Sequence, residues 1–486
     1  MNGKQMPGMN QQPADGQQMD VDEIIKQYKK ALKHDPDNNG LHHDLGLAYM
    51  EKGEHNKAVS AFAKAIKIDP DMTSARHFLA VAYAEMGKLD AAQSEWERVI
   101  ASEPEDSSGH YAAAHYFLGW IYTVQSRWDE AIEKLEKACE MEPNQPRSYH
   151  SLAEAYVGAG KPIEAAEAWN KVLKINPNDL RAYHNLCAVL HDRGMYEEAI
   201  EVGQRALRMG SESPIPRVNI ALSYLAQNQL DEAEKYMKEA VEITPDDTDS
   251  RVNLGEIYAR RGELDRACGE WEKVLETQPD HPDAHFNLGQ AARVQGKSEL
   301  ALQCWEKAMD AASSLPEEAR TPYLEQLHAN RALVLMNEGR YEEALKECSQ
   351  SAENNPSEPM NYNRAVLVCL KAGWSDKAQQ NLQKAEQAAE DDEHLGTMFM
   401  RGMYELQQGN HVEGAQLWEK VLDKEPDAAL AVRAQVQEIF DVDDLEQLID
   451  KLQEQGHTEE SSAVKTFKSA VSPVIDEDLK GGKEWK

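Results

Sequence analysis

The chain is 486 residues long, which is too many for one compact domain and ample for a large buried core. It carries 86 Asp and Glu residues against 52 Lys and Arg residues, a formal net charge of −34. This acidic balance argues against nucleic acid and against an anionic membrane surface as ligands, because both attract basic surfaces. It favours solubility and is compatible with basic protein partners, but the simpler interpretation, which we favour, is that the surplus glutamates solvate exposed helix faces. No stretch reaches the roughly 20 apolar residues of a membrane span, so we expect no direct membrane insertion.

We expect no secretory signal in residues 1–20, because they contain no apolar core segment. They are rich in Gln, Gly, Met and Pro, a composition that predicts a disordered tail. The six cysteines include no Cys-x-x-Cys pair, and free thiols packed in a reducing compartment are the simplest account of them. A cytoplasmic location is therefore expected.

From residue 21 onward the chain repeats a pattern of paired amphipathic helices. Residues 21–38 form a half repeat, and the first full unit runs from Asn39 to Met72. Prolines end many later units at spacings of 34 residues or a multiple of it, as at Pro143, Pro177, Pro245 and Pro279. Because proline cannot continue a helix interior, each of them marks a unit boundary.

Within the first unit, small and large residues share two helical stripes. The positions that carry the pattern are Leu45, Gly46 and Tyr49 on the first helix, Gly53 at the turn, and Ala58, Phe62 and Ala65 on the second helix. The small residues let two helices approach closely, and Phe62 fills the remaining gap. A single hairpin of this kind cannot bury its apolar face, so neighbouring units must stack.

This template resembles the tetratricopeptide repeat (TPR), whose pattern is Leu-Gly-x-x-Tyr followed by Ala, an aromatic residue, Ala and Pro. A later copy reads Leu254, Gly255, Tyr258, Ala267, Trp271, Val274 and Pro279. Eleven units are found, starting at residues 39, 73, 112, 146, 180, 214, 248, 282, 325, 359 and 395. The resemblance implies an all-α protein, a right-handed superhelical solenoid of about eleven helix pairs with an N-terminal half repeat and a C-terminal helical cap.

The period breaks most strongly between the eighth and ninth units. Units 1–8 occupy residues 39–312 and units 9–11 occupy residues 325–428. The insertion at 313–324 predicts either a longer helix with a loop or a hinge between two repeat blocks, and the hinge is favoured. Residues 429–472 lose the repeat pattern and predict capping helices, and residues 473–486 predict a mobile tail. Three residues depart from the pattern where it expects Leu or Tyr, namely Arg331, Arg401 and Glu405.

The sequence carries no motif for catalysis, for a cofactor or for a metal. Residues 157–161 have the glycines and the lysine of a phosphate-binding loop without its spacing, and they coincide with a repeat turn. His281 and His285 lie four residues apart, but two ligands are too few for a metal site. We therefore expect that the chain is not an enzyme and holds neither cofactor nor metal.

In the TPR family, the first helix of each pair lines a concave groove that binds extended peptides or partner helices. One groove position recurs as asparagine, at Asn185, Asn219, Asn253 and Asn287 and again after the insertion at Asn330. A side-chain amide offers one acceptor and two donors, so an array of amides can hold a peptide backbone without reading its side chains. The array resembles the asparagine ladder of the O-linked N-acetylglucosamine transferase repeats. The alternative is that each asparagine bonds only locally within its own turn.

The adjacent groove position carries imidazole and aromatic rings in the first five units, at His43, His77, Tyr116, His150 and His184. Trp120 lies one turn beyond Tyr116. Such rings suit mixed polar and apolar recognition, and histidine charge would make binding respond near neutral pH. The alternative is a set of ordinary exposed histidines. Towards the other end, Phe399 and Met403 predict a more apolar stretch of groove.

These features fit three functions. The favoured one is a protein-interaction scaffold or assembly subunit that binds extended segments or partner helices in its groove. The second is a non-catalytic regulatory or substrate-recruiting subunit of a separately encoded enzyme, and the third is a self-assembling solenoid that forms a homo-oligomer. The basic clamp with which some TPR co-chaperones grip acidic chaperone tails is not expected, because its lysine positions hold other residues, Met360 among them.

Overall fold

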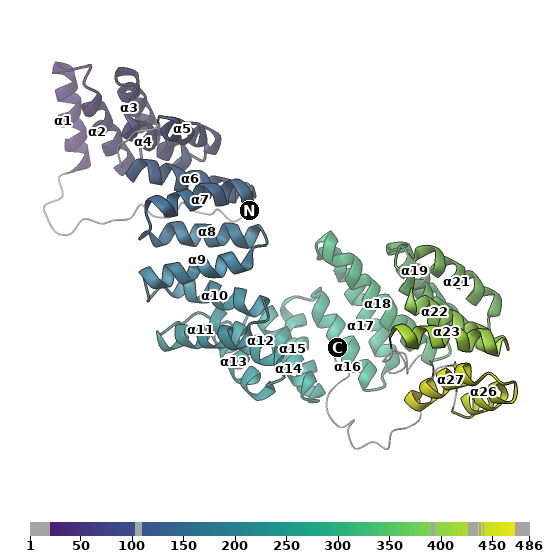
Figure 1. Ribbon diagram of the computed structural model, residues 1–486. Coiled ribbons are helices and arrows are strands. Elements are labelled where there is room, and N and C mark those ends of the chain that lie inside the picture. Colours follow the sequence, from purple (N-terminus) through teal and green to yellow (C-terminus); the bar gives the residue numbers. More distant parts are fainter. Residues whose placement is uncertain are drawn as a thin grey trace. The chain divides into compact units, whose positions relative to one another are not determined.

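The structure is a computed structural model that describes residues 20–102, 109–389, 394–425, 436, 439–440 and 442–471 (Figure 1). Over these ranges the regular elements are α-helices and one short 3-10 helix, without a strand. The chain divides into two compact units, Met1–Tyr236 and Met237–Lys486, and the division falls inside helix α13 (Leu230–Ile243). The tails predicted at 1–20 and 473–486 lie outside the described residues, apart from Asp20.

The first unit is a row of helix pairs preceded by α1 (Val21–His34). The first helices of its pairs are α2 (Asn39–Glu51), α4 (Thr73–Glu85), α6 (Gly109–Val124), α8 (Pro146–Gly158), α10 (Leu180–Asp192) and α12 (Ile215–Ala226). The second helices are α3 (His55–Ile68), α5 (Leu89–Ala101), α7 (Trp128–Met141), α9 (Pro162–Ile175) and α11 (Tyr196–Arg208). The helices of each pair pack on one another as antiparallel neighbours, and each pair packs on the next.

The second unit continues the same arrangement. Its first helices are α14 (Thr248–Arg260), α16 (Pro282–Val294), α18 (Glu317–Asn337), α20 (Pro359–Lys371) and α22 (Leu395–Gln407). Its second helices are α15 (Leu264–Thr277), α17 (Ser298–Ala311), α19 (Tyr341–Asn354), α21 (Ser375–Ala388) and α23 (His411–Lys424). Two further helices follow, α26 (Val442–Glu454) and α27 (Thr458–Val471). The prediction of an all-α array of repeated helix pairs is therefore confirmed.

The positions of the first helices follow the predicted unit starts closely. Eight of the eleven first helices begin at the residue where the sequence pattern places the start of a unit. The differences are at α6, which is described from Gly109 instead of 112, at α12, which begins one residue late, and at α18, which begins eight residues early. The pattern therefore located every helix pair, and it failed most where extra residues lengthen a helix.

The turn between the two helices of a pair requires a left-handed backbone residue. Gly53 adopts this left-handed conformation in the first pair, with φ of 73°. Its N–H donates to the carbonyl oxygen of Met50 at 2.9 Å. Glycine adopts this conformation without steric cost, because it has no Cβ atom. At the equivalent place in two other pairs the chain has Ser126 and Asn228, with φ of 59° and 58°. A non-glycine residue there costs on the order of 1 kcal/mol, so these turns are less favourable than the others.

Close contact between a small residue on a first helix and a large one on a second helix builds the core. A Cβ atom placed on Gly46 would lie 2.5 Å from Cε1 of Phe62, a distance that no real contact permits. Phe62 is fully buried. The prediction that small residues allow close helix approach while Phe62 fills the gap is met in this pair.

Ion pairs occupy the two places where charged residues replace the apolar repeat pattern. Arg331 on α18 contacts Glu347 on α19 through Nε at 3.0 Å and Nη2 at 2.9 Å. Arg401 and Glu405, both on α22, form a pair at 2.9 Å. Glu405 also accepts a hydrogen bond from Nδ2 of Asn410 at 2.7 Å. Each departure from the pattern therefore has a charged or polar partner close by.

The insertion between the eighth and ninth units is taken up mainly by helix. After α17 the chain forms one 3-10 turn (Ala312–Ser314), and α18 then begins at Glu317 with Pro322 inside its early turns. Arg320 donates to the carbonyl oxygen of Leu315 at 2.8 Å and holds the connection against the helix start. The described chain thus follows the longer-helix alternative, and a hinge at 313–324 stays a prediction.

The end of the second unit is closed by α26 and α27. Phe467 on α27 lies 4.4 Å from Trp418 on α23, measured between ring centroids, and it is fully buried. Leu445 and Leu452 on α26 are buried in the same cluster. The first part of the predicted cap, residues 429–441, lies almost entirely outside the described residues. No helix in the described part of the chain is both long and apolar enough to cross a membrane.

Candidate protein-binding surface

The first helix of a pair exposes one face and buries the others, as α10 shows. Its residues Tyr183, Leu186, Cys187 and Leu190 are buried against neighbouring helices. The family resemblance assigns to the groove the positions one, four, five, eight and eleven places after the start of each unit, which on α10 are 181, 184, 185, 188 and 191. All five remain at least partly exposed. The face that the family resemblance assigns to ligand binding is therefore accessible on this helix.

The recurring asparagines lie on this face in both units. In the first unit Asn185 and Asn219 stand on α10 and α12, which contact one another, and both are partly exposed. In the second unit Asn253 and Asn287 stand on the contacting helices α14 and α16, and Asn330 stands on α18. None of the five side-chain amides takes part in a hydrogen bond among the described residues. The local bonding that would explain these asparagines without a ligand is thus absent from the described structure.

Asn330 differs from the other four in the burial of its amide. Its Nδ2 atom is shielded from solvent and has no hydrogen-bond partner in the described part of the chain. An amide N–H that is buried without a partner costs about 1–3 kcal/mol, so an acceptor supplied from outside would relieve this cost. The other four amides are partly exposed and can hydrogen-bond to water. Replacing that water by a peptide group would therefore gain less binding free energy than at Asn330.

Histidines at the adjacent position mainly connect parts of the fold. Nε2 of His150 lies 3.1 Å from Oδ2 of Asp179, the residue that caps α10. Nε2 of His184 lies 2.8 Å from Oγ of Ser211, in the connection that leads to α12. His43 packs edge-on against the rings of Phe62 and Phe78, at centroid distances of 5.8 and 5.6 Å. Each imidazole therefore joins neighbouring segments instead of standing free on the surface.

Two of these histidines are poorly suited to sense neutral pH. Burial, together with the positive charges of His110 and Arg147, lowers the pKa of His77 to about 3. Its Nδ1 accepts a hydrogen bond from Nε1 of Trp96 at 3.3 Å, which requires an unprotonated nitrogen. Burial also lowers the pKa of His184. These two lowered pKa values argue against a charge-dependent response near neutral pH at His77 and His184.

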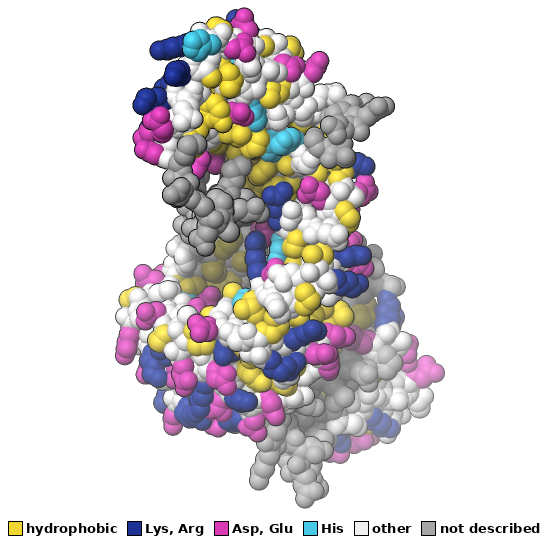
Figure 2. All heavy atoms as spheres, turned by 90° about the vertical axis from the view of Figure 1, so that its left-hand side faces the viewer, with side chains coloured by type: hydrophobic (Ala, Val, Ile, Leu, Met, Phe, Trp, Pro, Cys, Tyr) yellow, Lys and Arg dark blue, Asp and Glu magenta, His cyan; other side chains and the backbone are white. Residues whose placement is uncertain are grey.

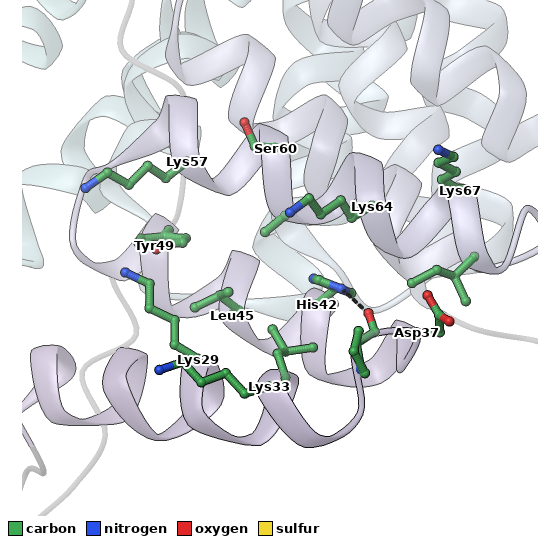
Figure 3. Close-up of a pocket in the computed structure, with 14 residues that line it drawn as sticks. Lys29, Lys33, Asp37, His42, Leu45, Tyr49, Lys57, Ser60, Lys64 and Lys67 are labelled. Atoms are coloured by element: carbon green, nitrogen blue, oxygen red, sulfur yellow. Dashed lines mark hydrogen bonds between the residues drawn. The ribbon is translucent and has the colours of Figure 1, made fainter.

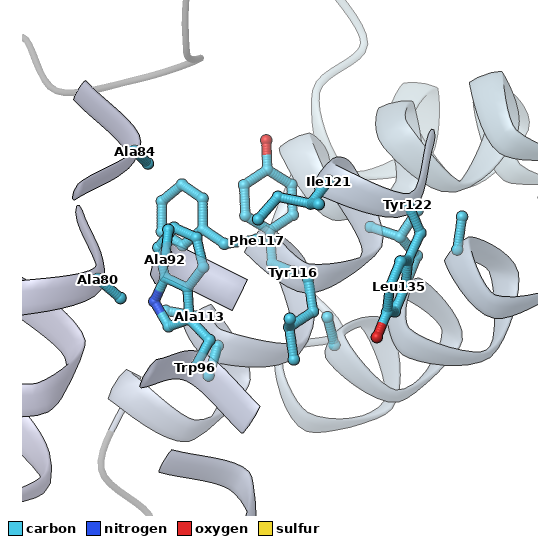
Figure 4. Close-up of a cluster of buried hydrophobic side chains, with 14 of the residues drawn as sticks. Ala80, Ala84, Ala92, Trp96, Ala113, Tyr116, Phe117, Ile121, Tyr122 and Leu135 are labelled. Atoms are coloured by element: carbon cyan, nitrogen blue, oxygen red, sulfur yellow. The ribbon is translucent and has the colours of Figure 1, made fainter. Parts of the chain in front are cut away.

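The aromatic and sulfur-containing candidates are mostly core residues. Tyr116 is almost fully buried in the cluster drawn in Figure 4, and the guanidinium of Arg147 covers its ring at 4.9 Å. Trp120 is partly exposed and packs against the same cluster. Phe399 and Met403 are buried in the second unit, where Phe399 stacks on Trp418 at 5.6 Å. Of these four residues, only Trp120 presents a surface to a ligand in this structure.

His281 and His285 both form hydrogen bonds at the start of α16. Nδ1 of His281 accepts the N–H of Ala284 at 3.4 Å and caps α16. Nε2 of His285 lies 2.8 Å from the carbonyl oxygen of Pro279. Among the described residues there is no group of three or more His, Cys, Asp or Glu side chains that could hold a metal ion.

The sequence reasoning missed a lysine-lined groove on the first unit. It lies between α1 and α3, with α2 as its floor, and encloses about 910 Å³ (Figure 3). Lys29 and Lys33 stand on α1, and Lys57, Lys64 and Lys67 stand on α3. A signal was present, because residues three, four and seven apart share one face of a helix and Lys26, Lys29, Lys30 and Lys33 have this spacing. What the spacing alone did not reveal is that α3 turns its own lysines towards them.

Three family models match this chain, and all three describe helical-repeat segments or domains. Residues 73–285 match the model of the cilia and flagella-associated protein 70 C-terminal domain. Residues 46–87 match a model described as TPR repeat, and residues 270–303 match one described as tetratricopeptide repeat. No curated protein sequence gives a significant match.

Several solved structures resemble parts of this chain, although their TM-scores are low. YrrB, described as a TPR protein with an unusual peptide-binding site, is 27% identical. The match covers 37% of this chain and 93% of YrrB, with a TM-score of 0.32. A tetratricopeptide repeat protein from Parabacteroides merdae is 19% identical, with coverages of 52% and 98% and a TM-score of 0.44. Yeast Tom70 is 14% identical, with coverages of 80% and 92% and a TM-score of 0.41.

The repeated helix pairs and the exposed face of their first helices define a helical-repeat protein of the kind that contacts other proteins. The residues that carry the repeat, together with the matching models, place the chain within one family of this class. It belongs to the tetratricopeptide-repeat proteins. The models that match describe repeat segments, and none of them describes a catalytic domain.

Proposed function

We propose that this protein is a non-catalytic interaction scaffold whose first helices hold extended segments of partner proteins. The observation that carries this proposal is the set of five asparagine amides at equivalent positions of first helices, none of which hydrogen-bonds within the described chain. Each unit supplies its own stretch of amides, Asn185 and Asn219 in the first, and Asn253, Asn287 and Asn330 in the second. A peptide backbone offers N–H and C=O groups that match both halves of an amide.

The surroundings of the amides favour a sequence-tolerant ligand. Val218 and Val252 precede Asn219 and Asn253 on their helices and are partly exposed, so they offer apolar contact beside the polar array. An extended segment advances about 3.3 Å per residue and exposes backbone groups along both edges. Amides on adjacent helices can therefore bond the backbone, while neighbouring apolar residues add affinity without strong selection among side chains.

The test is affinity purification from native lysate with three versions of the full chain. The first is the wild type, and the second replaces Asn185, Asn219, Asn253, Asn287 and Asn330 by Ala. The third is a control that replaces Asn56, Asn170, Asn178 and Asn354 by Ala, four exposed asparagines away from the first-helix face. We expect partners that are retained by the wild type and the control and are lost from the first variant, while circular dichroism shows equal helix content.

Partners that bind the amide variant as well as the wild type would overturn this assignment. In that case binding would rest on other surfaces of the repeat pairs, and the asparagines would have no role in it. If a partner is lost from the amide variant, a direct titration with a purified fragment of that partner measures how far the affinity falls. Removing several hydrogen bonds worth about 1 kcal/mol each predicts a weakening of at least tenfold.

The match of residues 73–285 to a cilia and flagella-associated domain supports a more specific setting. We propose that the partners belong to an assembly of the cilium or flagellum, instead of the general cytoplasm that the cysteine pattern suggests. Expression of a fluorescently tagged full chain in ciliated cells tests this placement. Enrichment along the organelle supports it, and uniform fluorescence in the cell body contradicts it.

A further inference from the structure

The lysine-lined groove of the first unit combines positive charge with a concave shape. Five of its lining residues are lysines, and Asp37 is its single acidic lining residue. This local excess of positive charge occurs in a chain where acidic residues outnumber basic ones by 86 to 52. Figure 2 shows basic side chains in dark blue gathered near the top of the view, where α1 and its neighbours lie.

Most of these lysines have no carboxylate partner in the described chain. Lys57 pairs with Glu54 at 2.7 Å. Lys29, Lys33, Lys64 and Lys67 form no ion pair among the described residues, and all four are exposed. On other helices, by contrast, lysines such as Lys137 and Lys273 lie beside a glutamate three residues away. The groove therefore holds positive charge that the fold itself leaves unneutralised.

The floor of the groove is apolar and is formed by one face of α2. Leu45 and Tyr49 are nearly buried beneath the lysines, and Ile68 at the rim of α3 is 37% exposed. The ammonium groups of Lys29 and Lys57 approach the Tyr49 ring to 5.5 and 5.7 Å. A ligand in this groove thus meets positive charge at both sides and a hydrophobic surface at the centre (Figure 3).

The positive surface continues past the end of the groove. A smaller hollow of about 550 Å³ shares Lys29, Lys33 and Lys57 with it and adds Lys26, Lys30 and Lys52 together with the acidic residues Asp22 and Glu54. Lys26 pairs with Glu23 at 3.1 Å, so of the added lysines Lys30 alone has no ion pair among the described residues. Lys52 is partly neutralised, because it contacts Asp22 and lies 3.4 Å from Glu54. The combined surface lies on α1, α2 and α3 only, all within the first unit.

This groove is separate from the proposed ligand face of the first helices. On α2, residues 42, 45 and 49 turn towards the groove. The ligand-face positions of the same helix are 40, 43, 44, 47 and 50, which occupy a different stripe. The asparagine array begins later in the chain, on α10. The inference below therefore does not depend on the proposed function.

We infer that the groove binds an acidic peptide segment that carries an apolar side chain. The ten-residue step from Lys57 to Lys67 corresponds to about 15 Å of helix, which suits roughly five residues of extended chain. Glutamates or aspartates would contact the lysines on α1 and α3, and the apolar side chain would rest on Leu45 and Tyr49. The distant acidic residues of this protein repel such a peptide only weakly, because charges more than about 8 Å away are screened at physiological salt.

The concave shape selects a peptide over other polyanions. A flat membrane surface reaches exposed lysine tips but not a floor between two helices, and duplex nucleic acid is far wider than the groove. A short acidic peptide can enter and use both the charged sides and the apolar floor. Phosphatidylserine vesicles and a DNA duplex are therefore the competing ligands that the experiment must separate.

Fluorescence anisotropy with the full chain and a fluorescein-labelled peptide, Glu-Glu-Leu-Glu-Glu, tests this inference. The test variant is Lys29→Glu, Lys33→Glu and Lys64→Glu, and its control is Lys171→Glu, Lys174→Glu and Lys384→Glu, which reverses three exposed lysines elsewhere. We expect saturable binding to the wild type that weakens at least tenfold in the test variant and less than twofold in the control. A second variant with Gln at the same three groove positions guards against misfolding and should give an intermediate loss.

Two further comparisons examine the chemistry of the site. Replacing Leu by Ser in the peptide should weaken binding several-fold because the apolar contact is lost, and raising the salt concentration should weaken it further. The asparagine variant described above should bind this peptide like the wild type. Equal binding to the test and control variants overturns the inference. So does a wild type that ignores the peptide while it binds phosphatidylserine vesicles or a DNA duplex through the same lysines.

Discussion

Gly255 on α14 lies directly beneath the indole of Trp271 on α15, and a Cβ atom on this glycine would come within 2.3 Å of Nε1. The bare backbone lets the indole approach closely enough to donate a hydrogen bond to the carbonyl oxygen of Val252 at 3.1 Å. Two other pairs repeat this geometry. Trp305 lies over Gly289 and bonds Phe286, and Trp418 lies over Gly402 and bonds Phe399, both at 3.2 Å.

Where alanine replaces this glycine, the indole N–H of the tryptophan has a different hydrogen-bond partner or none. Trp96 faces the position of Ala80, and its Nε1 donates to the side chain of His77 instead of a backbone carbonyl. Trp169 faces the position of Ala153, and its buried Nε1 has no partner in the described structure. In both pairs with alanine at this position, the indole N–H therefore makes no hydrogen bond to a backbone carbonyl among the described residues.

The variant Gly255→Ala should destabilise the pair formed by α14 and α15. The added methyl group must displace Trp271, and overpacking of this kind costs about 1–3 kcal/mol. The gain in helix propensity, about 1 kcal/mol, offsets only part of the loss. Local unfolding governs exchange in repeat proteins, so hydrogen–deuterium exchange of peptides from these two helices is the appropriate measurement.

Gly269→Ala on the same helix pair is a matched control. A Cβ atom at Gly269 would meet nothing within 4 Å, so the substitution should stabilise α15 by about 1 kcal/mol. We therefore expect faster exchange in Gly255→Ala and slower exchange in Gly269→Ala. Slower exchange in both variants would show that Trp271 adapts without loss and that the glycine is not required.

Replacing either partner of the ion pair between Arg331 and Glu347 should lower the stability of the protein. Burial raises the pKa of Glu347, but the hydrogen bond from His328 at 2.7 Å and the charge of Arg331 outweigh it, so the net pKa is lowered. Arg331→Leu restores the repeat pattern but leaves the carboxylate without its main cation. We expect a loss of about 3 kcal/mol in the free energy of unfolding, measured by denaturant titration.

The double variant Arg331→Leu with Glu347→Leu should recover much of that loss, because no buried charge then remains unpaired. The lowered pKa also sets a pH window. The stability that Glu347 contributes is present above its ordinary pKa near 4.5 and is lost as the pH falls through the lower folded value. A double variant that is no more stable than Arg331→Leu would contradict this account.

The buried imidazole of His77 should make the first unit less stable in mild acid. Its pKa is about 3 when folded and near 6.5 when unfolded, so the unfolded chain binds the extra proton between these values. Stability is therefore full above pH 6.5 and falls as the pH drops towards 3, by roughly 2 kcal/mol at pH 5. His77→Gln keeps an acceptor for Trp96 and removes this titration.

Thermal midpoints at pH 7 and pH 5 provide the measurement for this prediction. The drop between the two values should be smaller in His77→Gln than in the wild type. His34→Gln is the control, since His34 is exposed and its replacement should leave the drop unchanged. Equal drops in all three proteins would mean that His77 is protonated in the folded state.

The helix pairs and their boundaries were largely predictable, whereas the accessibility of candidate site residues was not. Pro177 and Gly53 mark a boundary and a turn through local backbone restrictions that operate in any context. The groove positions of His77 and Asn185 are assigned by the same register argument, yet His77 is buried and Asn185 is partly exposed. The difference arises because Trp96, His110 and Phe117 close over His77, and their positions depend on neighbouring pairs.

The sequence by itself determined that this protein is an array of helix pairs, because proline, glycine and the apolar stripe act within a few residues of one another. It also determined which large residue meets which small one inside a pair, since that contact spans a single hairpin. Only the tertiary structure decided that Lys33 on α1 and Lys64 on α3 face one groove. Their side chains come together because α2 packs between the two helices and sets the orientation of both, a relation that no local pattern encodes.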